Sequence, residues 1–185
     1  MVEAIFPEFQ QTFPPTGERV PYDPSRHDAF AAKVPAILAE EWRARGFGAY
    51  GEGILWIPDP GAPFLDPGDW PAVEEASVEV LRTAFGHVCL WQGGKFLWLN
   101  VYSGNAVSYG SDAEAVFYSA KTKDFLKNVL HERLFQLANK RLGKLGAEEC
   151  FGFAPLPALG GAIAAEYLIK TKMREYVSLA AQVLG

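Results

Sequence analysis

The chain has 185 residues, of which 49% are hydrophobic, 14% aromatic and 21% charged. This length suits one compact domain, and the composition excludes a disordered chain, a collagen-like repeat and a small disulfide-stapled protein. The formal net charge is -5, whereas a protein that neutralises nucleic-acid phosphates needs a basic surface, so direct binding of nucleic acid is not expected.

The first 25 residues contain five prolines and predict an irregular leader that wraps the domain. A helix is expected to begin near Ser25. Asp28, three residues later, takes the place that Glu or Gln has in a capping box. A second helix is predicted over Ala36–Arg45, because Pro35 suits its first turn and Gly46 follows its end. A glycine cluster and a short apolar run that ends at Ile57 come next.

Residues 58–72 hold five prolines and three acids, so a loop is predicted here, with a brief helix beyond Trp70. Three β-prone runs follow and predict an antiparallel meander. They are 87–91, 95–101 and 105–109, separated by the hairpin signals Gly93-Gly94 and Ser103-Gly104. Apolar side chains leave both faces of the middle run, so we expect helices to cover both sides of the sheet.

Helices are expected from Asp112 onward. Leucines at helical spacing between 126 and 138 predict one long helix or two helices with a break near His131, and a final helix is predicted over 172–184. The uncharged run Cys150–Ala165 is too short and too interrupted to span a bilayer, and we interpret it as buried turns and loop. The predicted fold class is α+β, a mainly antiparallel sheet with flanking helices in a single compact domain.

The N-terminal residues have neither the basic nor the long apolar region of a secretory signal, which predicts a cytosolic protein. Cys89 and Cys150 lack a CxxC spacing. In a reducing cytosol we expect no disulfide between them and interpret both as core thiols.

The segment Gly46–Gly51 matches the sequence pattern of the dinucleotide fingerprint GxGxxG, but its structural context does not match. It follows a predicted helix and precedes a strand, which is the reverse of the order that such a site needs, so we interpret it as a tight helix-to-strand connection. No phosphate-binding GxxxxGK[ST] loop and no GxSxG motif are present. Nucleotide binding and α/β-hydrolase chemistry therefore have no support.

The histidines and paired carboxylates, which could bind a metal or act in catalysis, are dispersed along the sequence. His27, His87 and His131 have no HExxH spacing and no nearby cysteine pair, so no metal site is predicted. Adjacent carboxylates occur at 40-41, 74-75 and 148-149, but neighbours on a helix diverge by about 100° and do not share a face. We predict no catalytic residue, no cofactor and no metal ligand.

The net charge is unevenly distributed. Residues 59–80 carry six acids and no base, whereas residues 121–145 carry seven bases and two acids. Leucines interleave the basic stretch, so we interpret it as a core helix with a basic outer face. The acidic stretch has two interpretations: a solvated loop, or a docking surface for a basic protein in which Phe64, Leu65 and Trp70 are apolar anchors.

Three segments resemble a known family. The run Glu41-Trp42-Arg43, followed by the glycine-rich segment 46–53 and Leu55-Trp56, resembles the N-terminal GAD-like domain. The segment 82–86, which leads into Leu90-Trp91, resembles the entry to the sheet of that domain. The segment 149–161 resembles the C-terminal domain of bacterial type VI secretion immunity proteins.

The resemblance covers about residues 4–182. It divides the chain into a GAD-like half, 1–110, and a helical immunity half, 111–185, within one structural unit. The matching residues are mostly glycines and aromatics that look structural, so they identify the family better than they locate a site.

The resemblance implies a cytoplasmic bacterial protein that neutralises a cognate type VI secretion toxin, typically a DNase, in a 1:1 complex and without enzymatic activity. The toxin-binding residues that we predict lie mostly on the acidic stretch: Glu52, Trp56, Asp59, Asp66, Asp69, Trp70, Glu74 and Glu75. Two alternatives remain from the residues themselves. One is a small-molecule module with an aromatic pocket near Trp56, Trp91 and Trp98, and the other is a hydrolase of unknown type.

Overall fold

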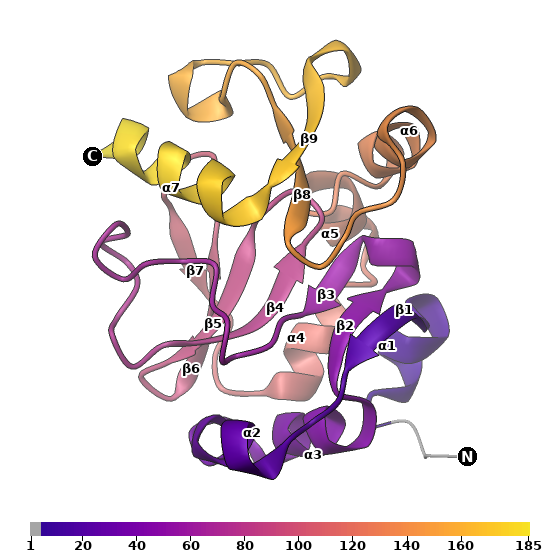
Figure 1. Cartoon of the computed structure of the whole chain (residues 1–185), viewed down its shortest axis with the longest axis vertical. Helices are drawn as coiled ribbons and strands as arrows, with labels where there is room; N and C mark the ends of the chain where they lie inside the picture. The colour runs from indigo at the N-terminus through magenta and orange to yellow at the C-terminus, as the bar shows by residue number, and fades with distance from the viewer. Residues whose placement is uncertain (1–4) are drawn as a thin grey trace.

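Figure 1 shows the computed structural model of the chain, in which residues 5–185 are described. The helices are α1 (Pro7–Thr12), α2 (Pro24–Ala31), α3 (Ala36–Arg45), α4 (Ala113–Ser119), α5 (Lys123–Asn128), α6 (Glu132–Leu142) and α7 (Met173–Leu184). The strands are β1 (Pro15–Val20), β2 (Phe47–Tyr50), β3 (Leu55–Ile57), β4 (Val78–Thr83), β5 (Val88–Gln92), β6 (Lys95–Leu99), β7 (Ala106–Ser108), β8 (Glu149–Phe153) and β9 (Leu168–Lys172). Short 3-10 turns are η1 (Gly51–Gly53), η2 (Pro157–Leu159) and η3 (Ala165–Tyr167).

The strands β1 to β7 form one antiparallel sheet in sequence order, and β8 pairs with β9 in a second, smaller antiparallel sheet. We call β8, β9, α7 and the turns between them the C-terminal lobe (residues 149–185). The predicted α+β class, with a mainly antiparallel sheet and flanking helices, is confirmed.

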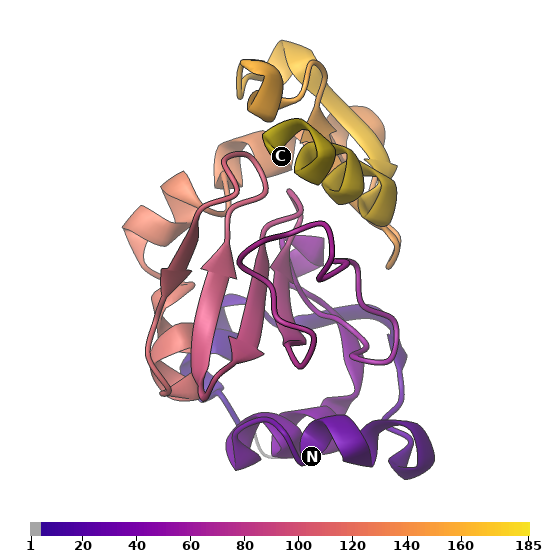
Figure 2. The same cartoon turned by 90° about the vertical axis from the view of Figure 1, so that its left-hand side faces the viewer.

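The two faces of the large sheet are covered differently. Trp98 of β6 lies opposite Cys89 of β5, and its ring contacts Phe125 of α5 with centroids 5.3 Å apart, so this face lies under the helices. Figure 2 shows α4 and α5 on one side of the sheet and the loop 58–77 on the other. The expectation that helices cover both sides is therefore wrong, because a loop covers the second face.

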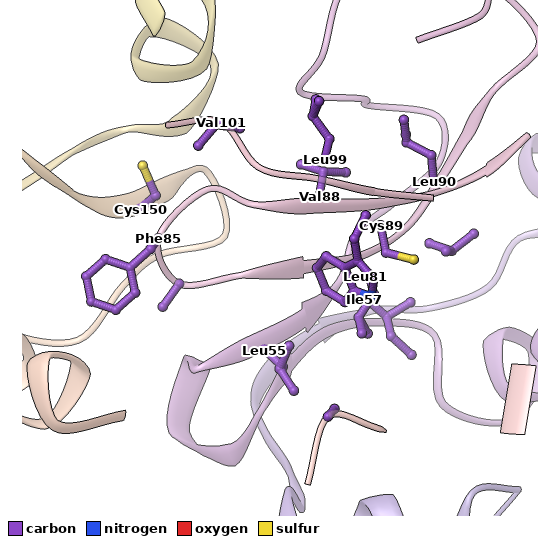
Figure 3. Close-up of a cluster of buried hydrophobic side chains, with 14 of the residues drawn as sticks. Leu55, Ile57, Leu81, Phe85, Val88, Cys89, Leu90, Leu99, Val101 and Cys150 are labelled. Atoms are coloured by element: carbon purple, nitrogen blue, oxygen red, sulfur yellow. The ribbon is translucent and has the colours of Figure 1, made fainter. Parts of the chain in front are cut away.

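The core lies between the sheet and these layers. Figure 3 shows buried side chains from β3 to β6 packed together, with Cys150 of β8 beside Phe85 at one edge. The ring of Phe85 stacks on Phe153 with centroids 5.7 Å apart, which joins the C-terminal lobe to the turn between β4 and β5. Cys89 and Cys150 are both buried and free, as predicted.

The N-terminal segment is more regular than predicted. Residues 1–4 of the expected leader lie outside the described residues, but the rest contains α1 and the edge strand β1. A Cβ atom at Gly46 would lie 2.1 Å from the carbonyl oxygen of Val20, so a glycine is needed for β1 to approach α3 this closely. The glycine cluster is thus a packing site for β1 and a helix-to-strand connection.

Helix boundaries agree in part with the prediction. The predicted bounds Ala36–Arg45 are those of α3. The first expected helix exists as α2, but Asp23 caps it, because its Oδ1 accepts the backbone N–H of Ser25 at 2.9 Å. The brief helix predicted beyond Trp70 is absent, because the described residues between Trp70 and β4 form turns.

The C-terminal region contains more strand than predicted. Of the two alternatives for the leucine-rich segment, two helices with a break near His131 are observed, since this residue has φ of +47° between α5 and α6. The run that begins at Cys150 opens with β8, so its interpretation as turns and loop is wrong for the first four residues. Residues 111–185 are therefore not purely helical.

Candidate functional site

The loop between β3 and β4 carries most of the predicted contact residues, and we call residues 58–77 the acidic loop. Its apolar side chains Leu65, Trp70 and Val73 are buried against the sheet. The indole of Trp70 is only 2% exposed. The interpretation of Leu65 and Trp70 as exposed anchors is therefore wrong. Their side chains pack on the face of the sheet that α4 and α5 do not cover.

Hydrogen bonds from β4 and β5 hold the acidic loop in place. Glu79 Oε1 accepts the backbone N–H groups of Phe64 and Leu65 at 2.8 and 2.7 Å. Burial raises the pKa of this carboxyl to about 7, although both hydrogen bonds oppose the rise. From β5, Gln92 donates to the carbonyl of Ala72 at 2.9 Å and accepts the N–H of Glu74 at 3.1 Å.

Turns and α7 fix the outer part of the loop. Asp66 Oδ1 accepts the N–H of Gly68 at 2.9 Å, a side-chain turn that suits an aspartate. Ser178 of α7 donates from its hydroxyl to Asp69 Oδ2 at 3.1 Å, and Arg174 donates to the carbonyl of Pro63. The conformation of the acidic loop is thus fixed by hydrogen bonds to the rest of the protein.

The outward carboxylates of the loop have no cation beside them. Asp66, Glu74 and Glu75 are exposed and Asp69 is half-buried. Within the described chain, no ion pair to any of these four is found within 4.0 Å. Their charge is therefore available to a partner.

Asp59 differs from these four because it is already paired. Its Oδ2 lies 3.2 Å from Arg26 of α2, and its Oδ1 lies 3.2 Å from Nε2 of His27. Nδ1 of His27 accepts the N–H of Asp23 at 2.8 Å, which leaves the hydrogen on Nε2, facing Asp59. Asp59 therefore joins the acidic loop to α2.

Glu52 and Trp56 lie away from the outward carboxylates. Glu52 is exposed in η1 and pairs with Lys144 at 2.5 Å. Trp56 is 7% exposed and donates from Nε1 to the carbonyl of Gly53 at 2.8 Å. The structure thus places the five predicted aspartates and glutamates of the loop on one segment, but not these two residues with them.

A cleft of about 640 Å³ adjoins the acidic loop, between the β1 to β3 edge and the C-terminal lobe. Arg82 forms part of its wall. The guanidinium carbon of Arg82 lies 4.4 Å from the ring centroid of Trp56 and 5.1 Å from that of Phe64, and burial lowers its pKa to about 10. Its N–H groups donate to the carbonyl of Ala147 at 2.7 Å and to that of Glu149 at 3.3 Å.

Sequence reasoning missed Arg82, although an arginine inside the apolar strand VEVLRT is an available signal. Its guanidinium contacts two aromatic rings and donates to two carbonyls, so it links β4 to Ala147 and to the first residue of β8. The cleft wall also holds Arg19, whose N–H groups donate to the carbonyls of Arg45, Ala49 and Gly46. These guanidinium groups act as structural links.

The aromatic pocket of the small-molecule alternative is not assembled as predicted. Trp56 pairs with Arg82, and Arg82 pairs with Val88, which places Trp56 on the face of Val88. Trp98 pairs with Cys89, the neighbour of Val88, and therefore lies on the opposite face. Trp56 and Trp98 cannot line one pocket.

Burial shifts the pKa values of His87 and Cys150 away from neutral pH. Burial lowers the pKa of His87 to about 3, and its Nδ1 accepts the N–H of Val101 at 3.2 Å. Burial raises the pKa of the Cys150 thiol to about 12, far from that of an activated nucleophile. Over residues 5–185, no three His, Cys, Asp or Glu side chains are arranged to hold a metal ion, and no helix has the length and apolar character to cross a membrane.

Comparison with known proteins identifies the class of this α+β chain. Residues 4–103 match the GAD-like domain, and residues 112–183 match the C-terminal region of the T6SS immunity protein Tdi1. The chain belongs to the family of type VI secretion system immunity proteins in which a GAD-like domain precedes a Tdi1-type C-terminal region.

A solved structure shows the same fold. The crystal structure of Atu4351 from Agrobacterium tumefaciens superposes with a TM-score of 0.74 at 17% sequence identity, over 94% of this chain and 86% of that chain. The comparison with curated proteins gives no match.

Proposed function

We propose that the protein binds a DNase toxin of the type VI secretion system in a 1:1 complex in the bacterial cytoplasm and blocks its DNA-binding surface. The observation that carries this proposal is the acidic loop, whose four outward carboxylates are unpaired and held on a fixed scaffold. Family membership supplies the immunity role. The protein acts by binding, without a catalytic residue, cofactor or metal of its own.

The electrostatics favour a DNA-binding partner. A DNase presents basic side chains where it contacts phosphates, and a row of carboxylates offers the same negative charge. Four of the six acids of residues 59–80 have no ion pair within 4.0 Å among the described residues, namely Asp66, Asp69, Glu74 and Glu75. Such complementarity speeds association and makes the affinity depend on salt.

The test reverses the charge of two exposed carboxylates of the loop, Glu74 and Glu75. A Glu74→Lys, Glu75→Lys variant leaves the bonds of Asp66 and Asp69 intact, because neither glutamate side chain is bonded to another described residue. We expect at least a tenfold lower affinity for a catalytically inactive toxin encoded beside this gene, a slower association rate and a weaker salt dependence. Calorimetry or surface-binding kinetics at two salt concentrations measures all three.

The matched control is Glu40→Lys, Glu114→Lys, which changes the net charge equally on two exposed acids of α3 and α4. It is expected to lower the association rate only slightly. Equal affinity of both double variants for the toxin would contradict the role of the acidic loop. Failure of the unaltered protein to bind the toxin would contradict the immunity function itself.

A small molecule in the cleft is the second candidate function, since about 640 Å³ is within the range of ligand pockets. Trp56, Phe64 and Ile57 supply its apolar wall. A metabolite that raises the unfolding temperature of the unaltered protein, with the effect lost in a Phe64→Ala variant, would favour this function.

A further inference from the structure

Three well-exposed apolar side chains lie on the C-terminal lobe, and we call Leu159, Ile163 and Leu179 the apolar patch. Their exposed fractions are 64%, 42% and 50%. Leu159 ends η2, Ile163 lies on the segment that follows, and Leu179 lies on α7. The elements η2 and α7 contact each other, and both views show this turn beside the helix (Figures 1 and 2).

The turn that presents Leu159 is fixed by its own backbone. The N–H groups of Leu159 and Gly161 both donate to the carbonyl of Leu156, at 2.9 and 3.0 Å. A Cβ atom at Gly161 would lie 2.1 Å from the carbonyl oxygen of Pro155, so the chain is tightly folded here. Leu159 therefore cannot turn inward without breaking this arrangement, and its outward position is preorganised for a partner.

Leu179 lies on the solvent side of α7. The core side of this helix consists of Met173, Tyr176, Val177, Ala180 and Ala181. At 100° per residue, Leu179 lies about 130° from the centre of that side. Its exposure is a consequence of the helix register, because no rotation of α7 buries Leu179 without exposing the core side.

Helix α7 lies between the apolar patch and the acidic loop. Ser178, next to Leu179 in the helix, donates to Asp69 of the loop at 3.1 Å. One turn earlier, Arg174 donates to the carbonyl of Pro63. An α-helix with its side chains is about 10 Å wide, so the loop and the patch lie within the width of a single protein interface.

We infer that the acidic loop and the apolar patch form one docking surface, whose partner is the basic toxin of the proposed function. Leu159, Ile163 and Leu179 supply the apolar centre, and the carboxylates supply the charged rim. The run Cys150–Ala165 contains no charged residue, in keeping with an interface centre from which charges are depleted. The patch thus takes the anchoring role that the buried Trp70 cannot fulfil. This inference rests on the proposed function.

The test uses single variants Leu159→Ser and Leu179→Ser with the catalytically inactive toxin encoded beside this gene. Both side chains are at least half exposed, so we expect thermal unfolding to remain near that of the unaltered protein. We expect at least a tenfold loss of affinity for each variant, mainly through faster dissociation and with an unchanged salt dependence. Tyr118→Ser is the control, because Tyr118 is 54% exposed on α4 and far from the patch.

Affinities of both leucine variants within twofold of the control would overturn the inference. If the Glu74→Lys, Glu75→Lys variant bound the toxin more weakly in the same assay, the proposed function would stand without the patch. If the unaltered protein did not bind the toxin, the proposed function would fail first. A dimer in light scattering that Leu179→Ser dissociates would also overturn the inference, because the patch would then bind a second copy of the chain.

Discussion

Glu79 holds the acidic loop while it is itself almost excluded from water. Its Oε1 accepts two backbone N–H groups, and the side chain is buried at 4% exposure. Burial raises its pKa from 4.5 to about 7. Between these values the folded protein binds more protons at Glu79 than the unfolded chain does, so the free energy of unfolding falls as the pH rises from about 4.5 to 7.

A Glu79→Gln variant is expected to lose this pH dependence, since the amide oxygen can accept the same two N–H groups without ionising. Relative to the unaltered protein, its free energy of unfolding should rise by about 2 to 3 kcal/mol between pH 5 and pH 8. Urea denaturation at the two pH values measures this difference. Parallel pH profiles of the two proteins would contradict the assignment.

Individual side chains of the loop show what the sequence could predict. Proline and aspartate in residues 58–72 predicted a loop, and a loop is present. The same residues gave no indication that Trp70 points inward, because a loop has no period from which to assign an inner and an outer side. Glu79 looked like one more surface acid, yet its two bonded N–H groups make it the support of the loop.

At the scale of elements, helices and strands with a regular hydrophobic period could be predicted from the sequence. Strands that form only because another strand pairs with them could not. The helix α3 and the β5 to β7 meander follow from spacing and from turn residues, and the leucine spacing left a break near His131 as one of two alternatives. The strand β1 was missed because prolines flank it, and only its pairing with β2 makes it a strand. The strand β8 was missed because glycines and prolines follow it directly.

The packing of α7 on β8 depends on a glycine. A Cβ atom at Gly152 would lie 2.5 Å from the Tyr176 ring, whose hydroxyl accepts the N–H of Phe153 at 3.1 Å. A Gly152→Ala variant is expected to displace this ring and to lower the free energy of unfolding by about 1 to 3 kcal/mol. Chemical denaturation measures the change.

The matched control for this element is Gly146→Ala, which lies before β8, where a Cβ atom would meet only the flexible carboxylate of Glu149. It should change the stability by less than about 1 kcal/mol. A loss as large as that of Gly152→Ala would mean that the contact with Tyr176 is not the cause. The same Gly152→Ala variant should also weaken toxin binding if α7 positions Leu179 as inferred.

At the scale of the whole molecule, the acidic loop and the start of the basic stretch lie on opposite faces of the large sheet. The acidic loop covers one face, and α5, which carries part of the basic stretch, covers the other (Figure 2). The segment charges were readable from the sequence, but their separation depends on which layer each segment joins. The sheet therefore separates the acidic loop from α5, and the loop lies next to α7 of the C-terminal lobe.

His87 and Glu79 give this molecule opposing responses to acid. His87 has a pKa of about 3 in the fold against 6.5 for a free side chain, because burial disfavours its charged form. Its contribution to stability is complete above pH 6.5 and is lost as the pH falls toward 3. Burial also lowers the pKa of the neighbouring His131, which adds to the same trend. Glu79 acts in the reverse sense between pH 7 and 4.5.

Between pH 6.5 and 4.5 the changes in stability from His87 and Glu79 should nearly cancel. Below pH 4.5 the loss from His87, about 1.4 kcal/mol per pH unit, should no longer be opposed by Glu79. A His87→Asn variant retains an acceptor for the N–H of Val101 but cannot take up the proton. We expect it to be less stable at pH 7, yet to lose less stability between pH 4.5 and 3 than the unaltered protein. Denaturation curves across this range measure both slopes, and equal slopes would show that acid unfolds the protein through other groups.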